Sequence, residues 1–175
     1  MGERLSSLYN LTREAETARH VWDDVTTEIK SCGREDVLQS PTVLDIGGGM
    51  GEFSKYLNGQ GIRSISLDKK DLEVPPEANP VRATAYQMPF ADATFNIVHG
   101  SGVFDVSIVH GHGILDSFIY PHDFPKLVAE IARVLAPRGI LSIYDGNPPP
   151  ASELEKLFAR LSKQDKDFPT LWEKK

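Results

Sequence analysis

A cluster of glycines directly after a short apolar run is the feature that most constrains how this chain can fold. Residues 43–53 read VLDIGGGMGEF, so the apolar run ends in four glycines within five positions. Glycine adopts positive φ angles without steric cost and lets the backbone approach a ligand closely. Phe53, Tyr56 and Leu57 then follow at helical spacing. The pattern predicts a buried strand, a tight turn and a helix start, the unit that cradles nucleotide-like ligands.

Strand-like and helix-like segments alternate along the chain. Apolar, β-branched runs predict strands at residues 42–46, 62–67, 81–85, 95–99 and 140–144. Apolar residues at three- and four-residue steps predict helices at residues 8–31, 52–58 and 124–136. Ser152 and Glu155 form a capping box that predicts a helix to about residue 162, and residues 168–172 are a candidate further strand. The predicted fold class is α/β: a Rossmann-like, doubly wound, mainly parallel sheet of five to six strands with helices on both faces.

Length and charge narrow the class of protein. At 175 residues and 40% hydrophobic composition, a single domain (1–175) is predicted, with a helical cap (1–40), a cofactor-binding core (41–145) and a truncated C-terminal helix with a candidate edge strand (146–175). A net charge of −6 argues against a nucleic-acid partner, which would favour a basic surface. No apolar run reaches the ~18 residues of a membrane span. The single Cys32 fits a reducing compartment, so a cytoplasmic location is expected.

Two aspartates stand where the first two strands should end, and both bear on the ligand. In an open parallel sheet, ligands lie beyond the carboxyl ends of the strands. Asp68 follows the second strand, where a carboxylate can accept hydrogen bonds from both hydroxyls of a ribose. A nicotinamide or flavin dinucleotide would need a glycine at position 52, where Glu52 stands, and Asp45 would repel its phosphates. The pattern favours a nucleoside that carries an amine.

Four segments in order resemble the motifs of class I S-adenosylmethionine-dependent methyltransferases, with a methyltransferase type 11-like domain. They are VLDIGGGMG (43–51), SLD (66–68), QMPFADATFNIV (87–98) and EIARVLAPRGIL (130–141). The resemblance implies S-adenosylmethionine as the cofactor. The binding residues that it implies are Asp45 for the amino group; Gly47, Gly48, Gly49 and Gly51 for the methionine part; Asp68 for the ribose, with Lys69 beside it; Gln87 and Met88 for the adenine; and Gly100 and Ser101 near the methyl group.

The chain departs from this family in two places. Thr84 stands where family members often carry an aspartate that binds the adenine amine, which predicts a weaker adenine contact. The family usually finishes its sheet with two further strands, one of them antiparallel, yet this chain ends about thirty residues after the fifth strand. The C-terminal edge of the sheet is therefore expected to be shortened, or to be covered by another chain in a homo- or hetero-oligomer, because an open edge is a liability.

The methyl acceptor is expected to be a small molecule, reached from the long segment between residues 100 and 123. Methyl transfer depends mainly on in-line positioning, and a general base helps when the acceptor is a hydroxyl. His110 and His112 lie two residues apart among glycines and are the candidate catalytic bases. A zinc site in this segment lacks the usual ligand spacing, so no metal is expected. His99 lies within an apolar strand and is interpreted as a core histidine.

Three functions stay open at this point. The first is methyl transfer from S-adenosylmethionine to a small molecule by in-line displacement. The second is a cofactor-binding but inactive partner or regulatory protein, which the expected loss of two strands and Thr84 favour. The third is a nicotinamide-dependent oxidoreductase, against which Glu52 argues. The helix at residues 8–31 is either a packing layer or a lid over the glycine turn.

Overall fold

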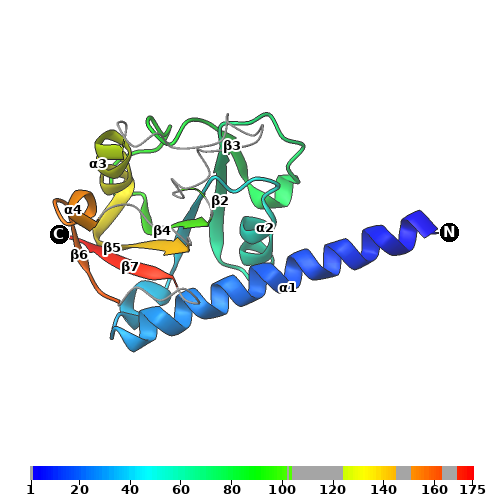
Figure 1. Ribbon diagram of the computed structural model, residues 1–175, viewed down its shortest axis with the longest axis horizontal. Coiled ribbons are helices and arrows are strands. Elements are labelled where there is room, and N and C mark those ends of the chain that lie inside the picture. The colour runs from blue at the N-terminus through cyan, green and yellow to red at the C-terminus, as the bar shows by residue number, and fades with distance from the viewer. Residues whose placement is uncertain (1, 102, 104–123, 145–150, 163–168) are drawn as a thin grey trace.

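The computed structural model describes residues 2–101, 103, 124–144, 151–162 and 169–175, with side chains from Glu16 onwards. Its helices are α1 (Gly2–Ser31), α2 (Glu52–Gly59), α3 (Phe124–Val134) and α4 (Ala151–Leu154), with the 3₁₀ helices η1 (Glu35–Leu38) and η2 (Pro76–Ala78). Its strands are β1 (Thr42–Ile46), β2 (Arg63–Asp68), β3 (Pro80–Arg82), β4 (Phe95–Ser101), β5 (Leu135–Tyr144), β6 (Phe158–Arg160) and β7 (Thr170–Lys174). Figure 1 shows α1 running along one side of the molecule and projecting beyond it at the N-terminal end. No helix in these ranges is both long and apolar enough to cross a lipid bilayer.

The seven strands form one sheet in the order β3-β2-β1-β4-β5-β7-β6. The first five strands pair in parallel, whereas β7 pairs antiparallel with both β5 and β6. The predicted α/β class, with a mainly parallel and doubly wound sheet, is confirmed. The strand order reverses at β1, which lies between β2 and β4. Because ligands of such sheets bind where the order reverses, the carboxyl end of β1 is the place to look for a site.

The predicted strand count and the shortened C-terminal edge are wrong, because strand β6 lies where a helix was predicted. Helix α4 ends at Leu154, and β6 then pairs with β7. Leu154, Leu157, Phe158 and Leu161 follow one another at helical spacing. Phe158 nevertheless begins strand β6, and its side chain is wholly buried in the core. The candidate strand at 168–172 is confirmed as β7. Pairing between the two strands therefore overrides a local helical pattern, and the sheet has both of the strands that were expected to be missing.

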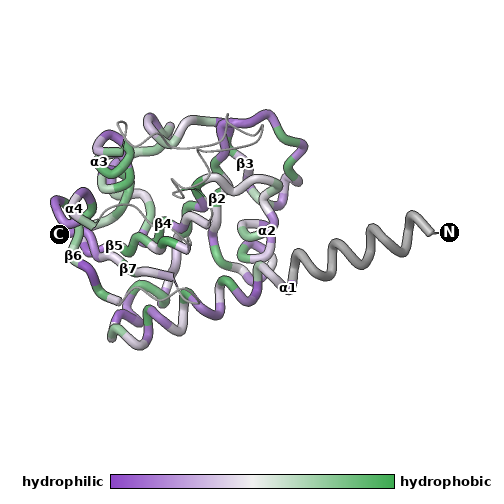
Figure 2. The backbone as a smooth tube through the Cα atoms, in the orientation of Figure 1, coloured by the Kyte–Doolittle hydropathy of each residue, from purple (hydrophilic) through white to green (hydrophobic). Residues whose placement is uncertain are grey.

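Helices cover both faces of the sheet, as predicted. On one face, Val25 of α1 and Leu57 of α2 pack with Val43 of β1 in one buried cluster. On the other face, Ile131 of α3 lies in a second cluster with Leu44. Successive residues of β1 thus point into opposite cores, as the alternation of a strand requires. Figure 2 shows the hydrophobic strands β4 and β5 in the middle of the molecule, between these two layers.

A buried arginine ties the end of α1 to the far side of the sheet. Arg34 is only 5% exposed and lies three residues after the end of α1. Its guanidinium pairs with Asp36 at 2.9 Å and with Glu173 of β7, and it donates to the carbonyl of Arg138 at 2.8 Å. The hydrogen bond to Asp36 is the largest cause that raises the pKa of Arg34. Together these contacts fix the position of α1 against the sheet.

Candidate functional site

The glycine turn after β1 lies at the centre of the candidate site. Gly47 has a φ of +68°, and a Cβ atom there would overlap Val103. A Cβ atom on Gly48 would overlap the hydroxyl of Ser66 and lie 2.6 Å from the carboxylate of Asp45. Neither position accepts a side chain without displacing its neighbours. The bare backbone of the turn is therefore pressed against the ends of β1 and β2.

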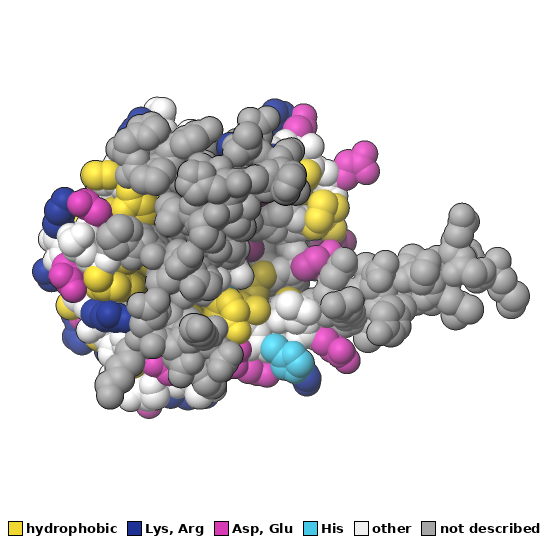
Figure 3. Space-filling model, viewed as in Figure 1, with side chains coloured by type: hydrophobic (Ala, Val, Ile, Leu, Met, Phe, Trp, Pro, Cys, Tyr) yellow, Lys and Arg dark blue, Asp and Glu magenta, His cyan; other side chains and the backbone are white. Residues whose placement is uncertain are grey.

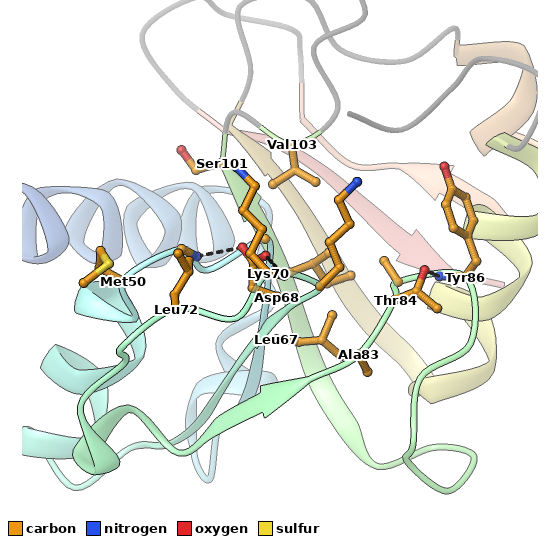
Figure 4. A pocket seen from close by; sticks show the side chains of 15 residues that line it. Met50, Leu67, Asp68, Lys70, Leu72, Ala83, Thr84, Tyr86, Ser101 and Val103 are labelled. Carbon is orange, nitrogen blue, oxygen red and sulfur yellow. Dashed lines mark hydrogen bonds between the residues drawn. The ribbon is translucent and has the colours of Figure 1, made fainter. Parts of the chain in front are cut away.

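A first cavity of about 370 Å³ opens on one side of this turn. It is lined by the ends of β1, β2 and β4, by the segment after β2 and by residues 83–86, which follow β3. Figure 4 shows Met50 and Leu72 on one side of the cavity and Thr84 and Tyr86 on the other, with Asp68 between them. The volume falls in the range of small-molecule sites, and most of the lining is apolar with a few polar groups, as in such sites.

The carboxylate of Asp68 lines the first cavity and is oriented by two backbone N–H groups. Its Oδ2 accepts a hydrogen bond from the N–H of Gly49 at 3.1 Å, and its Oδ1 accepts one from the N–H of Lys70 at 2.8 Å. These bonds orient the carboxylate and leave further lone pairs on both oxygens. Lys69 and Lys70 line the same cavity. The arrangement can accept hydrogen bonds from a pair of neighbouring hydroxyl groups.

A second cavity of about 460 Å³ opens on the other side of the turn, between the sheet, α1 and the start of α2. Its lining residues are Thr17, Ala18, Val21, Asp45, Gly47, Gly48, Glu52, Phe53, His99 and Ser101. The two cavities share Gly47 and Ser101, so the glycine turn is their common wall. Helix α1 is thus both a packing layer, through its buried C-terminal half, and one wall of the site.

A row of buried polar side chains crosses the sheet beside the second cavity. Ser66, Asp45, His99 and Ser142 lie in register on four adjacent strands. Burial raises the pKa of Asp45 to about 8, and the nearby charge of Asp68 contributes to the shift. Burial lowers the pKa of His99 to about 4, and its Nδ1 lies 3.2 Å from the hydroxyl of Ser142. Near neutral pH the Asp45 carboxyl and the His99 imidazole are therefore mostly uncharged.

Most of the predicted cofactor residues line one of the two cavities: Asp45, Gly47, Gly48, Gly49, Asp68, Lys69 and Ser101. The other four do not. Gly51 caps α2 with a φ of +77°, and Gly100 lies buried within β4. Gln87 is exposed, and Met88 is buried in the core, where its N–H donates to Glu130 of α3 at 2.6 Å. None of these four residues lines either cavity, and their part in binding stays a prediction.

Several lining residues were not among the predicted cofactor residues, although Thr84 stands at a position that binds the adenine in many family members. Thr84 and Tyr86 reach the first cavity because β3 ends at Arg82, three residues before the predicted end of that strand. His99, which was interpreted as a core histidine, is 1% exposed and also lines the second cavity. The hypothesis that residues 8–31 form a lid over the glycine turn anticipated that α1 would form a wall of the second cavity. The candidate bases His110 and His112 lie outside the described residues.

Comparisons with known sequences find methyltransferases. A family model described as a methyltransferase domain matches residues 44–143. The chain is 30% identical over 158 residues to probable methyltransferase PMT7 of Arabidopsis thaliana. The aligned region covers 85% of this chain and 21% of that protein. The chain therefore spans about a fifth of the length of this curated relative.

Two solved structures share the fold. The PH0226 protein of Pyrococcus horikoshii OT3 superposes with a TM-score of 0.60 at 16% identity, covering 88% of this chain and 91% of that one. A TehB-like SAM-dependent methyltransferase of Corynebacterium glutamicum superposes with a TM-score of 0.59 at 15% identity, covering 94% of this chain and 100% of that one. At these identities the likeness shows the Rossmann-like fold alone.

The residues present fit the cofactor that the family implies. S-adenosylmethionine joins a nucleoside to an amino acid, and the two cavities meet at Gly47, where a side chain would overlap its neighbour. Asp68 can accept hydrogen bonds from ribose hydroxyls in the first cavity, and the buried Asp45 can meet an amino group in the second. The family match and this donor set support S-adenosylmethionine as the cofactor. Because the family model covers residues 44–143 of the 175, the chain belongs to the methyltransferase domain family.

Proposed function

We propose that this chain binds S-adenosylmethionine across the two cavities and transfers its methyl group to a small-molecule acceptor. The observation that carries the proposal is the pair of cavities, which share Gly47 and Ser101. A ligand with a nucleoside at one end and an amino acid at the other matches two compartments that meet at a bare backbone turn. Their volumes of about 370 and 460 Å³ suit such a ligand with room for a small acceptor.

The adenosine end belongs in the first cavity. Asp68 accepts hydrogen bonds from the ribose hydroxyls, since its carboxylate is already oriented by two backbone N–H groups. The apolar side chains of Leu72 and Ala85 offer the adenine a surface to pack against. Thr84 can hydrogen-bond the adenine edge, although its hydroxyl also accepts from the N–H of Tyr86 at 3.3 Å. These residues take the place that the sequence assigned to Gln87 and Met88.

The methionine end belongs in the second cavity beside Asp45 and Gly48. An ammonium group next to the Asp45 carboxyl favours its ionised form and lowers its raised pKa. Binding therefore converts a buried neutral acid into half of an ion pair and releases a proton. The cost of burying the Asp45 carboxylate is offset only when the ligand is present, which makes this residue specific for a ligand that carries an amine.

When bound, the cofactor supplies a methyl group on a positively charged sulfur. The chain's own contribution is positioning, because a nucleophile held in line with the carbon–sulfur bond needs little further assistance. Ser101 lies at the edge that both cavities share, which is where the methyl group would face an acceptor. His110 and His112 stay candidate bases for an acceptor that must lose a proton.

The competing functions have lost part of their support. An inactive partner protein was favoured by the expected loss of two strands, but the sheet has all seven, so Thr84 alone favours it now. A nicotinamide-dependent oxidoreductase would place a pyrophosphate near the glycine turn, where the second cavity has the carboxyls Asp45 and Glu52. On the face shown in Figure 3, acidic and basic side chains are interspersed along the α3–α4 edge, which supports a small molecule over nucleic acid. A cytoplasmic location stays a prediction from the single Cys32.

Calorimetry and a labelled-methyl assay test this proposal. The purified chain is titrated with S-adenosylhomocysteine and with NAD, and is then incubated with S-adenosylmethionine carrying a labelled methyl group and a small-molecule extract. We expect S-adenosylhomocysteine to bind and label to appear in a small product. Binding without any labelled product would favour the inactive partner, and binding of NAD alone would overturn both.

A further inference from the structure

The two cavities differ in the ionisable side chains that line them. Among the described residues, the first cavity has Lys69 and Lys70 beside Asp68, whereas the second has the acids Asp45 and Glu52 and no lysine or arginine. The one imidazole in the second cavity, His99, is uncharged near neutral pH because burial lowers its pKa to about 4. Because burial also keeps Asp45 mostly uncharged, Glu52 is the charged group of this lining near neutral pH, and a cationic ligand beside it would be stabilised.

The two acids of the second cavity occupy different positions. Asp45 lies under the glycine turn, 4% exposed and within reach of whatever sits on Gly48. Glu52 opens helix α2, and its side chain is 25% exposed. One acid is thus placed to meet the amine of a bound cofactor, and the other is left for a second ligand.

The present partner of Glu52 is weak. Lys55 Nζ lies 3.7 Å from it, one turn along the helix, and is itself 37% exposed. Exposed ion pairs of this kind contribute at most about 1 kcal/mol. An ammonium group inside the cavity can therefore replace Lys55 as the partner of Glu52 at little cost.

The remaining polar and aromatic groups suit the same kind of ligand. The ring of Phe53 lies 4.7 Å from that of His99, centroid to centroid, and an aromatic face attracts a cation. Because Nδ1 of His99 is engaged with the hydroxyl of Ser142, Nε2 is the ring atom left for a ligand. When Nδ1–H donates to that hydroxyl, Nε2 carries a lone pair that accepts an N–H hydrogen bond.

We propose, on the basis of the proposed function, that the methyl acceptor is a small amine held in the second cavity between Glu52 and His99. The amine enters as an ammonium ion and gives a proton to the Glu52 carboxylate, which passes it to solvent at its exposed edge. The freed lone pair on nitrogen attacks the methyl carbon, so that a carbon–nitrogen bond forms as the carbon–sulfur bond breaks. The bonding electrons go to sulfur, and the methylated ammonium product leaves.

Probes matched in shape and different in charge test this inference. The chain, saturated with S-adenosylhomocysteine, is titrated with benzylamine, benzyl alcohol and benzoate, and the same three skeletons with longer alkyl chains follow. Transfer of labelled methyl groups to each probe is measured in parallel with S-adenosylmethionine. We expect the amines to bind and be methylated at least about tenfold better than the alcohols and carboxylates. Equal or better use of alcohols or carboxylates, or no preference in any series, would overturn the inference.

Two matched variants connect the preference to Glu52. Glu52→Gln should weaken amine binding about tenfold, because a charge-assisted contact becomes a neutral one, and should leave S-adenosylhomocysteine binding unchanged. Glu153→Gln is the control, since Glu153 also lies in the first turn of a helix, pairs with a lysine three residues on and is 28% exposed. An equal loss of S-adenosylhomocysteine and amine binding in Glu52→Gln would assign Glu52 to the cofactor and overturn the inference. If S-adenosylhomocysteine does not bind even to the unchanged chain, the proposed function itself fails.

Discussion

Replacing Asp45 with asparagine is expected to stabilise the folded chain at neutral pH while impairing its site. An aspartate has a pKa near 3.9 in an unfolded chain, whereas burial raises that of Asp45 to about 8. As the pH rises between these values, the unfolded state loses this proton and the folded state keeps it. Each pH unit then lowers the free energy of unfolding by about 1.4 kcal/mol. The contribution is absent below the unfolded pKa and complete above the folded one.

The size of the effect follows from the pH interval. From pH 4 to pH 7 the ionisation of Asp45 in the unfolded chain should lower the free energy of unfolding by about 4 kcal/mol, at about 1.4 kcal/mol for each unit. Asparagine does not ionise, so the stability of Asp45→Asn relative to the unchanged chain should rise by that amount over the same interval. Any difference in how the amide fits the site is the same at both pH values and cancels.

Urea unfolding at pH 4, 5, 6 and 7 measures this difference. Asp71→Asn is the matched control, because the side chain of Asp71 is 80% exposed, and its effect should stay within about 0.5 kcal/mol across the series. A difference between Asp45→Asn and the unchanged chain that stays constant with pH, or that falls as pH rises, would refute the account of Asp45 as a buried, mostly protonated acid.

Three further substitutions test separate parts of the structure. Gly48→Ala should lower the free energy of unfolding by about 1–3 kcal/mol and abolish cofactor binding, since the added methyl group overlaps the hydroxyl of Ser66 and the carboxylate of Asp45. Gly59→Ala is the control, because a Cβ atom there meets no atom within 4 Å, and this variant should unfold at an unchanged urea concentration. Arg34→Ala should cost about 3 kcal/mol in the same assay because it removes the contacts that Arg34 makes to Asp36, to Glu173 and to the carbonyl of Arg138, and leaves Glu173 with Arg138 as its remaining ion-pair partner; a loss under 1 kcal/mol would contradict the role of Arg34 in fixing α1 against the sheet. Asp68→Asn should weaken S-adenosylhomocysteine binding at least about tenfold in calorimetry without lowering stability, as a charged acceptor becomes neutral; unchanged affinity would remove Asp68 from the site.

The parts of the structure that sequence predicted well are those with local causes. The turn after β1 needs glycine because a side chain at Gly47 or Gly48 overlaps its neighbours, and such a need is visible in the sequence itself. Asp68 was placed correctly at the end of a strand because strand ends follow from the apolar pattern. The parallel sheet then brought both of these to one edge.

The parts that sequence missed depend on contacts between distant segments. Phe158 lies in a strand because β7 is there to pair with it, and no local pattern reveals that partner. The second cavity lies between α1 and the sheet, far apart in sequence, so that Val21 of α1 and His99 of β4 line the same space. A histidine in an apolar strand gives no sign of whether a cavity opens beside it, so its place in the site could only be seen in three dimensions.

One measurement tests the two-compartment site most directly: the number of protons released when S-adenosylhomocysteine binds at pH 7. It is obtained by calorimetric titration in buffers of different ionisation enthalpy, with adenosine as the control ligand. Since burial raises the pKa of Asp45 to about 8, this group is about nine-tenths protonated at pH 7 by mass action. The account predicts that S-adenosylhomocysteine, whose ammonium ionises Asp45, binds with release of about 0.9 proton, and that adenosine binds more weakly with none. Failure to bind, or binding of S-adenosylhomocysteine without proton release, would contradict it.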